Sequence, residues 1–459
     1  MPAPLTRAYG DFLGSMATRA VPASCLAVAR LGFTDSLGVL LAGRAETAVT
    51  TLRAALRSDG DGGEVPALLG AARASASGAA LLDATAAHAL DYDDFAFSNH
   101  PSAVIVPAVL AVAARSGADG RRMAAAYVAG YEVWCDLFLR ERDHYYSRGW
   151  HPTAVLGPVG AAAAAAVAMG LDAERAMHAI AIAASQGGGV FENFGSMVKP
   201  LHGGRAAQSG VVAAGLAAAG MTASPTALEG ASGLMRALSP NGNVDIDTPP
   251  RLSETWHSAT RGLNLKRYPV VGAAQRLADM AVGLHAAGAP RDAAQVARIA
   301  VTISEKHLRV MPFGLPEGSL QAKFSLPFIV ACGLRHGRVG LAEVSDEAAA
   351  DPAIRALAQR IVITTTAEAD PNWPDAAPTD VLEIETTDGR RIAAPPVARW
   401  RGHADNPMDA AELRAKFMDC ARYADVPQDR ASALFDTLQR LEDLPGAAAI
   451  TSVLGATHG

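Results

Sequence analysis

Hydrophobic residues recur at helical spacing through roughly the first half of the chain. Ala supplies much of this apolar content, and small side chains allow helices to approach one another closely. A period near 3.6 residues places apolar side chains on one face, where they can pack against other helices. The pattern predicts helices over residues 22–41, 71–90, 102–116, 120–141, 153–170 and 172–185. A glycine-rich connection is predicted at 186–205, before another helix that runs to Gly220.

The pattern changes after about Lys266. Stretches rich in Val, Ile and Thr predict strands at 297–310, 359–366, 381–384 and 391–394, with a helix at 323–335. Asp388-Gly389 is typical of a hairpin turn between the last two strands. Past Arg401 the helical pattern returns, and Asp409 and Glu412 have the spacing of a capping box. The sequence therefore predicts a mainly α protein in which an α+β insert interrupts a large all-helical domain built from both chain ends. The predicted boundaries are 1–265 and 402–459 for the helical domain and 266–401 for the insert.

Composition narrows the class of protein. Half of the 459 residues are hydrophobic and 19% are charged, which favours a large core over disorder. A net charge of −6 gives no electrostatic footprint for nucleic acid or an anionic membrane, so neither is expected as a partner. The four cysteines, Cys25, Cys135, Cys332 and Cys420, form no CxxC pair, which argues against a zinc or iron–sulfur site. With no signal-peptide pattern at the N-terminus, we expect a cytoplasmic protein.

The densest group of chemically active residues lies between His88 and Pro101. Three carboxylates (Asp91, Asp93, Asp94) and two imidazoles (His88, His100) fall within this stretch. Carboxylates crowded in this way tend to shift in pKa, and they often bind metals or transfer protons. A solvated acidic turn at the end of a helix is an equally good interpretation from this stretch alone.

Known catalytic templates do not fit the chain. Motifs of the GxGxxG, GxxxxGK[ST], HExxH and GxSxG types are absent, and Ser196–Lys199 matches SxxK without its companion motifs. The stretch from Asp91 to Asp94 lacks the third acid of a magnesium-binding DDxxD motif, so no metal is expected.

Cations and imidazoles near glycines suggest a different chemistry. Lys and His side chains could neutralise a small polycarboxylate while an Asp or His moves a proton on the neighbouring carbon. The candidates, with Asp91, are His100, His151, Lys199, His202, Arg205 and Lys266.

Several segments, taken together and in order, resemble the MmgE/PrpD family of 2-methylcitrate dehydratases, cis-aconitate decarboxylases and an iminodisuccinate epimerase. They are His88–Asp94, His100-Pro101 with Pro107-Ala108, Gly149–Thr153, Lys199–Ala207, Leu228–Gly230, Lys266–Pro269, Lys323–Leu326 and Arg401–Pro407.

The resemblance implies that the α+β insert is a lid, that the protein is a homodimer, and that a cofactor-free site lies in the cleft between the domains. It implies catalytic roles for Asp91, His100, His151, Lys199 and Lys266. Asp91 would be the general base or its orienter, the two imidazoles would serve in acid–base chemistry or carboxylate binding, and the lysines would hold substrate carboxylates. As further substrate-binding residues we predict His202, Tyr145, Tyr146, Gln275 and Tyr268, with packing as the alternative role of the two adjacent tyrosines. Asp93 and Asp94 are expected only to shape the turn.

Two positions depart from the decarboxylase branch of this family. Phe95 stands where that branch carries Thr, in a linker that is one residue shorter, and Gln275 stands where a His is often found. An amide can bind a carboxylate but cannot shuttle a proton near neutral pH. The predicted function is a lyase of the dehydratase or decarboxylase type acting on a small di- or tricarboxylate. An isomerase or epimerase using the same proton abstraction and a non-catalytic carboxylate-binding relative are the alternatives.

Overall fold

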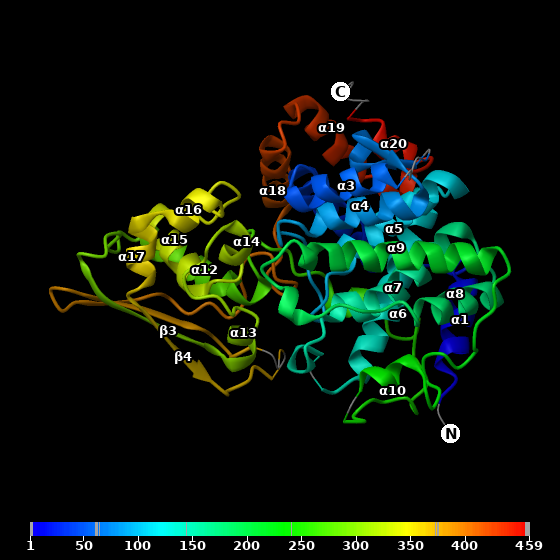
Figure 1. Ribbon diagram of the computed structural model, residues 1–459, viewed down its shortest axis with the longest axis horizontal. Helices are drawn as coiled ribbons and strands as arrows, with labels where there is room; N and C mark the ends of the chain where they lie inside the picture. The colour runs from blue at the N-terminus through cyan, green and yellow to red at the C-terminus, as the bar shows by residue number, and fades with distance from the viewer. Residues whose placement is uncertain are drawn as a thin grey trace. The chain divides into compact units, whose positions relative to one another are not determined.

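The computed structural model describes residues 3–59, 63, 65–143, 145–239, 241–371, 373 and 376–454, and the chain divides into two compact units. The helical unit comprises residues 1–193, 197–264 and 409–459. The sheet-containing unit comprises residues 194–196 and 265–408. Figure 1 follows the chain through both units in sequence colours.

The helical unit is built from both ends of the chain. Its N-terminal α-helices are α1 (Leu5–Ser15), α2 (Ala23–Gly43), α3 (Thr47–Ser58), α4 (Ala76–His88), α5 (Pro101–Ser116), α6 (Gly120–Arg140), α7 (Pro152–Met169), α8 (Ala173–Ala183), α9 (Val198–Ala218), α10 (Leu234–Leu238) and α11 (His257–Arg261). Its C-terminal α-helices are α18 (Ala410–Tyr423), α19 (Gln428–Leu438) and α20 (Ala448–Thr451). Short 3₁₀ turns cover Leu68–Gly70, Tyr145–Arg148, Phe191–Asn193 and Leu441–Asp443.

Small residues bring the central helices of this unit close together. A Cβ at Gly160 of α7 would lie 2.6 Å from the Trp134 ring of α6, and one at Gly204 of α9 would lie 2.1 Å from Thr85 Oγ1 of α4. Because real Cβ atoms do not tolerate such distances, glycine is what permits these helices to touch at these points. The close approach of α4 and α9 matters for the site, since His88 is the last residue of α4 and Lys199 lies in the first turn of α9.

Two helices of this unit, Ala23–Gly43 and Pro152–Met169, are long and apolar enough to cross a membrane by length and composition. Their most apolar windows are 72% and 94% buried within the protein, as is typical of the central helices of a packed core.

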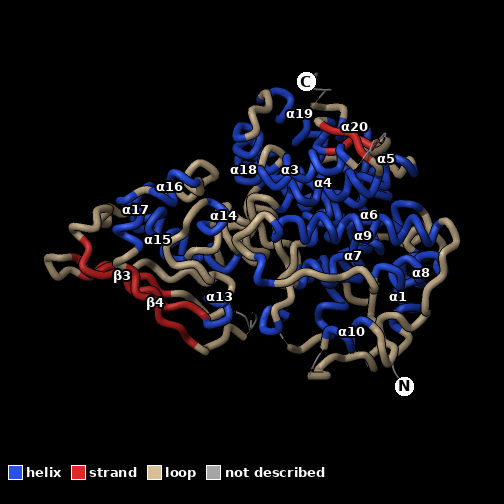
Figure 2. Tube along the Cα trace, in the orientation of Figure 1, coloured by secondary structure: helices blue, strands red, loops and turns tan. Residues whose placement is uncertain are grey.

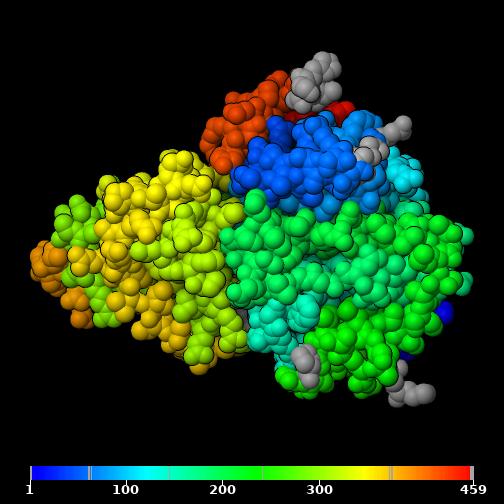
Figure 3. Space-filling view, viewed as in Figure 1, coloured from blue at the N-terminus to red at the C-terminus, as the bar shows by residue number. Residues whose placement is uncertain are grey.

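The C-terminal helices complete this same unit. Helix α18 packs against α2, and Figure 3 shows the orange and red end of the chain lying against the blue N-terminal helices. The capping box predicted at Asp409 and Glu412 is present: each side chain accepts a hydrogen bond from the other residue's backbone N–H. The prediction of a mainly α protein is confirmed.

Three local predictions were wrong in detail. Helix α4 begins at Ala76 rather than near 71, because Ser75 caps it by accepting from the Gly78 amide. The residues before it form a two-stranded antiparallel sheet of β1 (Val65–Ala67) and β2 (Ala72–Ala74), so this unit is not all-helical. The segment expected to be a glycine-rich loop as far as Arg205 is already helical from Val198, so Lys199 and His202 lie on a helix.

The sheet-containing unit carries a four-stranded sheet in the order β4-β3-β5-β6. The strands are β3 (Val296–Ser304), β4 (Ile361–Thr366), β5 (Val381–Thr386) and β6 (Arg391–Ala393). Strand β3 pairs parallel with β4 and antiparallel with β5, and β5 and β6 form the hairpin predicted around Asp388-Gly389. Its helices are α12 (Gln275–Ala286), α13 (Glu305–Arg309), α14 (Ser319–Ala322), α15 (Leu326–His336), α16 (Asp346–Ala350) and α17 (Pro352–Ala358), with a 3₁₀ turn at Gly272–Ala274.

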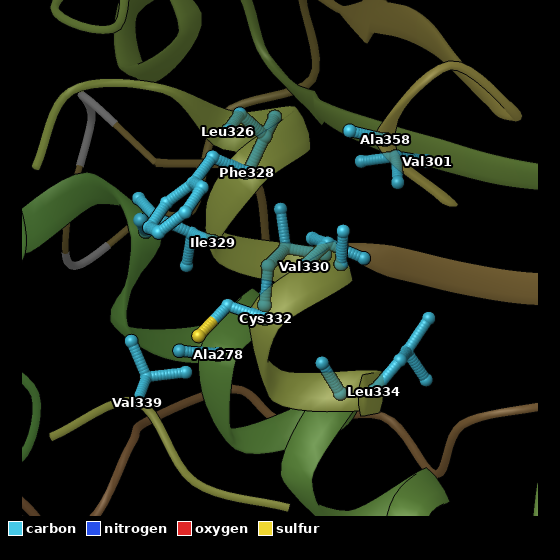
Figure 4. Packing of buried hydrophobic residues seen from close by; sticks show 14 of the residues in the cluster. Ala278, Val301, Leu326, Phe328, Ile329, Val330, Cys332, Leu334, Val339 and Ala358 are labelled. Carbon is cyan, nitrogen blue, oxygen red and sulfur yellow. The ribbon is translucent and has the colours of Figure 1, made fainter. Parts of the chain in front are cut away.

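The largest buried cluster of this unit consists of apolar side chains packed between the sheet and its helices. Figure 4 shows Phe328, Val330 and Leu334 of α15 among buried neighbours such as Val301 of β3 and Ala278 of α12. Figure 2 shows the strands of this unit in red with helices α12, α15 and α17 in blue beside them. The unit therefore gains its stability mainly by burying one face of a mixed sheet beneath helices.

Candidate functional site

Most of the site residues of the helical unit lie at the ends of helices. His88 is the last residue of α4, and Lys199 lies in the first turn of α9. His100 and His151 are the N-cap residues of α5 and α7, and each is followed by a proline at the start of its helix. Neither imidazole caps its own helix by a hydrogen bond, so both side chains are turned to other partners.

The Asp91 carboxylate forms a buried ion pair with the Lys199 ammonium. Asp91 adopts a left-handed backbone conformation, with φ of +50°, which costs energy for a residue other than glycine. The segment after it is tied down by two backbone hydrogen bonds between Phe95 and Asn264, of 3.0 and 2.9 Å. Fold and ion pair together hold Asp91 in this strained position.

Asp93 holds two imidazoles by their Nδ1 atoms. Its Oδ2 lies 3.0 Å from His88 Nδ1 and 2.8 Å from His100 Nδ1, and the His88 and His100 ring centroids are 4.4 Å apart. The expectation that Asp93 only shapes the turn was wrong, because its carboxylate fixes the orientation of both rings. With Nδ1 on the carboxylate, the Nε2 atom of each ring is directed elsewhere.

A second imidazole pair lies beside the first. His151 Nδ1 is 3.1 Å from His202 Nδ1, so one ring donates and the other accepts, and the two neutral rings hold complementary tautomers. His151 stacks on His88 with centroids 6.1 Å apart. Gly189 allows this packing, since a Cβ there would lie 2.4 Å from the Ala154 Cβ and 3.1 Å from the His202 ring.

Burial keeps three of these imidazoles neutral near pH 7. Burial lowers the pKa of His88 to about 3 and that of His202 to about 4, and the Lys199 ammonium adds to both shifts. The pKa of His151 is lowered well below its ordinary value by burial and by Lys199. Burial alone would raise the pKa of Asp93, but His88 and His100 outweigh it and hold that pKa well below the ordinary value. These three imidazoles are therefore neutral proton acceptors or donors near pH 7 rather than cations.

Helix ends also favour an anion here. The N-termini of α5, α7 and α9 carry His100, His151 and Lys199 respectively, and a helix N-terminus bears a partial positive charge. Neutral imidazoles add hydrogen-bond donors without repelling Lys199. The arrangement suits a ligand with a carboxylate group.

Four side chains of the site could ligate a metal by residue type. The potential ligand atoms of His88, Asp91, Asp93 and His100 lie within 4.8 Å of one another. However, both Nδ1 atoms are already directed at Asp93, and Asp91 is paired with the Lys199 ammonium. A divalent cation would have to replace those hydrogen bonds and sit close to an ammonium group, so the donor set fits proton transfer better than metal binding.

The two adjacent tyrosines differ. Tyr146 stacks on His151 with centroids 6.4 Å apart, and its hydroxyl donates to the Ser98 carbonyl at 3.5 Å. Tyr145 is buried against Phe138, with centroids 5.7 Å apart, and burial raises the pKa of its hydroxyl. Tyr146 therefore adjoins the site, and the packing role considered for both tyrosines fits Tyr145.

The remaining predicted residues, Lys266, Tyr268 and Gln275, belong to the sheet-containing unit. Gln275 Oε1 accepts from the Arg267 and Tyr268 amides, and its Nε2 donates to the Tyr268 and Val270 carbonyls. The Tyr268 hydroxyl donates to Asp279 at 2.6 Å. Gln275 is thus committed to holding the turn before α12, and we do not include it in the proposed site. Lys266 is fully buried, and its catalytic role stays a prediction.

The sequence interpretation named His88 and Asp93 in the stretch from His88 to Pro101 but assigned neither of them to the site. A local signal was available, because Asp93 follows His88, the last residue of α4, by only five residues. A second signal was the repeated His-Pro pair at 100–101 and 151–152, because proline is favoured at the first position of a helix and so predicts two imidazoles at helix starts.

Comparison with known proteins adds an independent line of argument. The model of the MmgE/PrpD N-terminal domain matches residues 7–247, and that of the MmgE/PrpD C-terminal domain matches residues 268–440. The chain is 28% identical over 393 residues to the cis-aconitate decarboxylase of Mus musculus, covering 82% of this chain and 78% of that protein. It is 27% identical over 396 residues to the cis-aconitate decarboxylase of Homo sapiens, covering 82% and 79%. A cis-aconitate decarboxylase-like protein of Aspergillus oryzae is 25% identical over 394 residues, covering 80% and 78%. Because the two family models together span most of the chain, this protein belongs to the MmgE/PrpD family.

Proposed function

We propose that this protein is a lyase of the decarboxylase or dehydratase type that acts on a small di- or tricarboxylate. The observation that carries the proposal is the buried Lys199–Asp91 pair surrounded by His88, His151 and His202, three imidazoles that burial keeps neutral. The related cis-aconitate decarboxylases support the same class of reaction, and cis-aconitate is the first substrate to test.

Both reaction types need the same two functions. Loss of carbon dioxide leaves an electron pair that a remaining carboxylate stabilises directly or through a neighbouring double bond, and loss of water begins by removing a proton from a carbon next to a carboxylate. In either case a nearby cation stabilises the charge that spreads onto the carboxylate, while a neutral acid or base moves the proton. In this proposal Lys199 supplies the cation, and the His151–His202 pair moves the proton. Because the two Nδ1 atoms share a hydrogen bond, one ring keeps an Nε2 acceptor and the other an Nε2–H donor.

Substrate binding would tune these imidazoles. Lys199 is one of the causes that lower the pKa of His151 and His202 in the ligand-free protein. A substrate carboxylate placed on Lys199 would offset its charge and raise both imidazole pKa values toward neutrality, where acid–base catalysis is most effective.

The proposal is tested with cis-aconitate, citrate, 2-methylcitrate and iminodisuccinate in ordinary and deuterated water, followed by NMR. A decarboxylase releases carbon dioxide and places one deuterium on the product carbon, and a dehydratase forms an alkene. Deuterium in recovered substrate, with neither alkene nor carbon dioxide, would instead favour the isomerase or epimerase alternative. If no compound is turned over and none raises the melting temperature, the lyase proposal is wrong.

A chelator tests the metal-free character of the site. We expect full activity after treatment with EDTA, since the site's carboxylates already have partners of their own, Lys199 for Asp91 and the two imidazoles for Asp93. Loss of activity that added Mg²⁺ or Zn²⁺ restores would revive the metal interpretation of the His88, Asp91, Asp93 and His100 cluster. The homodimer and the cytoplasmic location stay predictions.

A further inference from the structure

A second buried ion pair, between Lys416 of α18 and Asp35 of α2, contacts the backbone next to Asp93. The Lys416 ammonium is 2.6 Å from Asp35 Oδ1, and both side chains are buried. Neither residue stood out in the sequence interpretation, and neither contacts Lys199 or an imidazole of the site through a hydrogen bond or ion pair described here. We call Lys416 and Asp35 the clamp.

The clamp holds the backbone on both sides of Asp93. Lys416 donates to the Tyr92 carbonyl at 2.9 Å and lies 4.2 Å above the Tyr92 ring. Asp35 Oδ2 accepts a hydrogen bond from the Asp94 amide at 3.0 Å. The residues immediately before and after Asp93 are therefore each fixed by one member of the pair.

We propose that Lys416 and Asp35 are positioning residues that set the place of the Asp93 carboxylate, and through it the orientation of His88 and His100. The inference rests on the proposed function, since it assigns these two residues to the support of the same site. Displacement of a catalytic group by about 1 Å can cost about 100-fold in rate, so a rigid backbone on both sides of Asp93 has a clear consequence for catalysis.

The neighbouring Asp94 carboxyl has a different part. It is fully buried beside Ser102 and Tyr127, whose hydroxyls are 2.7 Å apart. Burial and the nearby Asp35 raise the pKa of Asp94 well above its ordinary value, which favours the protonated carboxyl and disfavours a second negative charge next to Asp93. An amide of the same shape should replace it without loss.

The test separates positioning from simple stabilisation by comparing four variants with the wild type, and a fifth variant, Arg422→Met, serves as the matched control. Lys416→Met removes the donor to Tyr92 but leaves Asp35 as an uncompensated buried charge, which destabilises a protein core. The double variant D35N/K416M removes that charge as well, while the amide oxygen introduced by D35N can still accept from the Asp94 amide. K416R keeps both the charge and a donor, and D94N replaces the protonated carboxyl.

Arg422 suits the control because it is an exposed residue of the same helix that pairs only with Asp419 among the described contacts.

We expect D35N/K416M to regain most of the melting temperature lost in K416M, yet to show kcat lowered about 10- to 100-fold with KM within about threefold of the wild type. K416R should keep kcat within about tenfold, and Arg422→Met and D94N should match the wild type. Wild-type kcat in the double variant would overturn the proposal, because it would show that Lys416 and Asp35 only stabilise the fold. A D94N variant that loses as much activity as D35N/K416M would also overturn it, by moving the role to Asp94.

A measurement without substrate keeps this proposal apart from the proposed function. Amide hydrogen exchange of the segment containing Asp93 and Asp94 should be at least about tenfold faster in D35N/K416M than in Arg422→Met, because the segment has lost an anchor. Faster exchange in a protein that turns over no carboxylate would support the clamp and reject the lyase. Unchanged exchange in an active enzyme would reject the clamp alone.

Discussion

Two buried lysine–aspartate pairs flank the same short segment of the helical unit, and they differ in their neighbours. Lys199 pairs with Asp91 at one end of the segment, and Lys416 pairs with Asp35 near the other. Among the described contacts, Lys416 otherwise meets a backbone carbonyl and the Tyr92 ring rather than imidazoles. Near Lys199 are imidazoles whose pKa values respond to its charge. A buried ion pair is thus a weak sign of function by itself, and the chemistry of its neighbours decides its role.

The largest expected difference between the pairs is in activity. Lys199→Met should lower kcat/KM by about 100- to 1,000-fold, because it removes the cation that stabilises charge on the substrate carboxylate. Steady-state kinetics on the substrate identified by the carboxylate panel measure this effect. A loss of less than about threefold would show that the two pairs do not differ in the way proposed.

Stability should rank the pairs in the opposite order. At pH 7.5 we expect Lys416→Met to lower the free energy of unfolding by about 3 kcal/mol, since the buried Asp35, whose pKa burial already raises, must then stay charged without a partner or take up a proton. Lys199→Met should cost less, because a nearby imidazole can take up a proton and compensate Asp91. Urea unfolding of both variants checks the ranking, and equal losses would contradict it.

Proton uptake by the imidazoles can be observed directly. In Lys199→Met the pKa of His202 should rise from about 4 toward its ordinary value of 6.5, because one of the two causes of the shift is gone. In Lys416→Met the pKa of His202 should stay at about 4. Histidine NMR titration measures both values, and an unchanged His202 in Lys199→Met would contradict the electrostatic account of the site.

The lowered pKa of His202 also makes the stability of the folded protein depend on pH. In the wild type, the unfolded chain protonates His202 below pH 6.5 and the folded protein only near pH 4, so acidification through this window favours unfolding. Replacing His202 by Gln removes this contribution. The stability of His202→Gln relative to wild type should therefore improve as the pH falls from 6.5 to 4, as urea unfolding at several pH values would show.

The smallest expected effects concern the two tyrosines. Tyr146→Phe removes a weak hydrogen bond to Ser98 but keeps the ring on His151, so kcat should change less than about threefold. Tyr145→Phe should leave both kcat and stability near the wild-type values, because the buried hydroxyl has no hydrogen-bond partner among the described residues. A large loss of kcat in either variant would show that a phenol takes part in proton transfer.

Local sequence patterns were sufficient to predict the fold class, some helix boundaries and two of the site residues. Helical periodicity predicted the mainly α fold, since the spacing of apolar residues is set by the geometry of the helix itself. It located α2 within two residues at each end, and a capping box marked the start of α18 correctly. The dense stretch from His88 to Pro101 also identified Asp91 and His100 as candidates, because these residues lie near each other in the chain.

What the sequence by itself determined, then, was the class of fold, the family, and the identity of the groups available for proton transfer. Only the tertiary structure decided which charge meets which partner: Asp91 with Lys199, Asp93 with His88 and His100, and Tyr92 with Lys416, 324 positions away. Helical periodicity depends on neighbours three or four residues apart, whereas these contacts depend on how whole helices pack. The protonation of the imidazoles was equally out of reach, because it depends on burial and on a lysine that reaches them only in the folded chain.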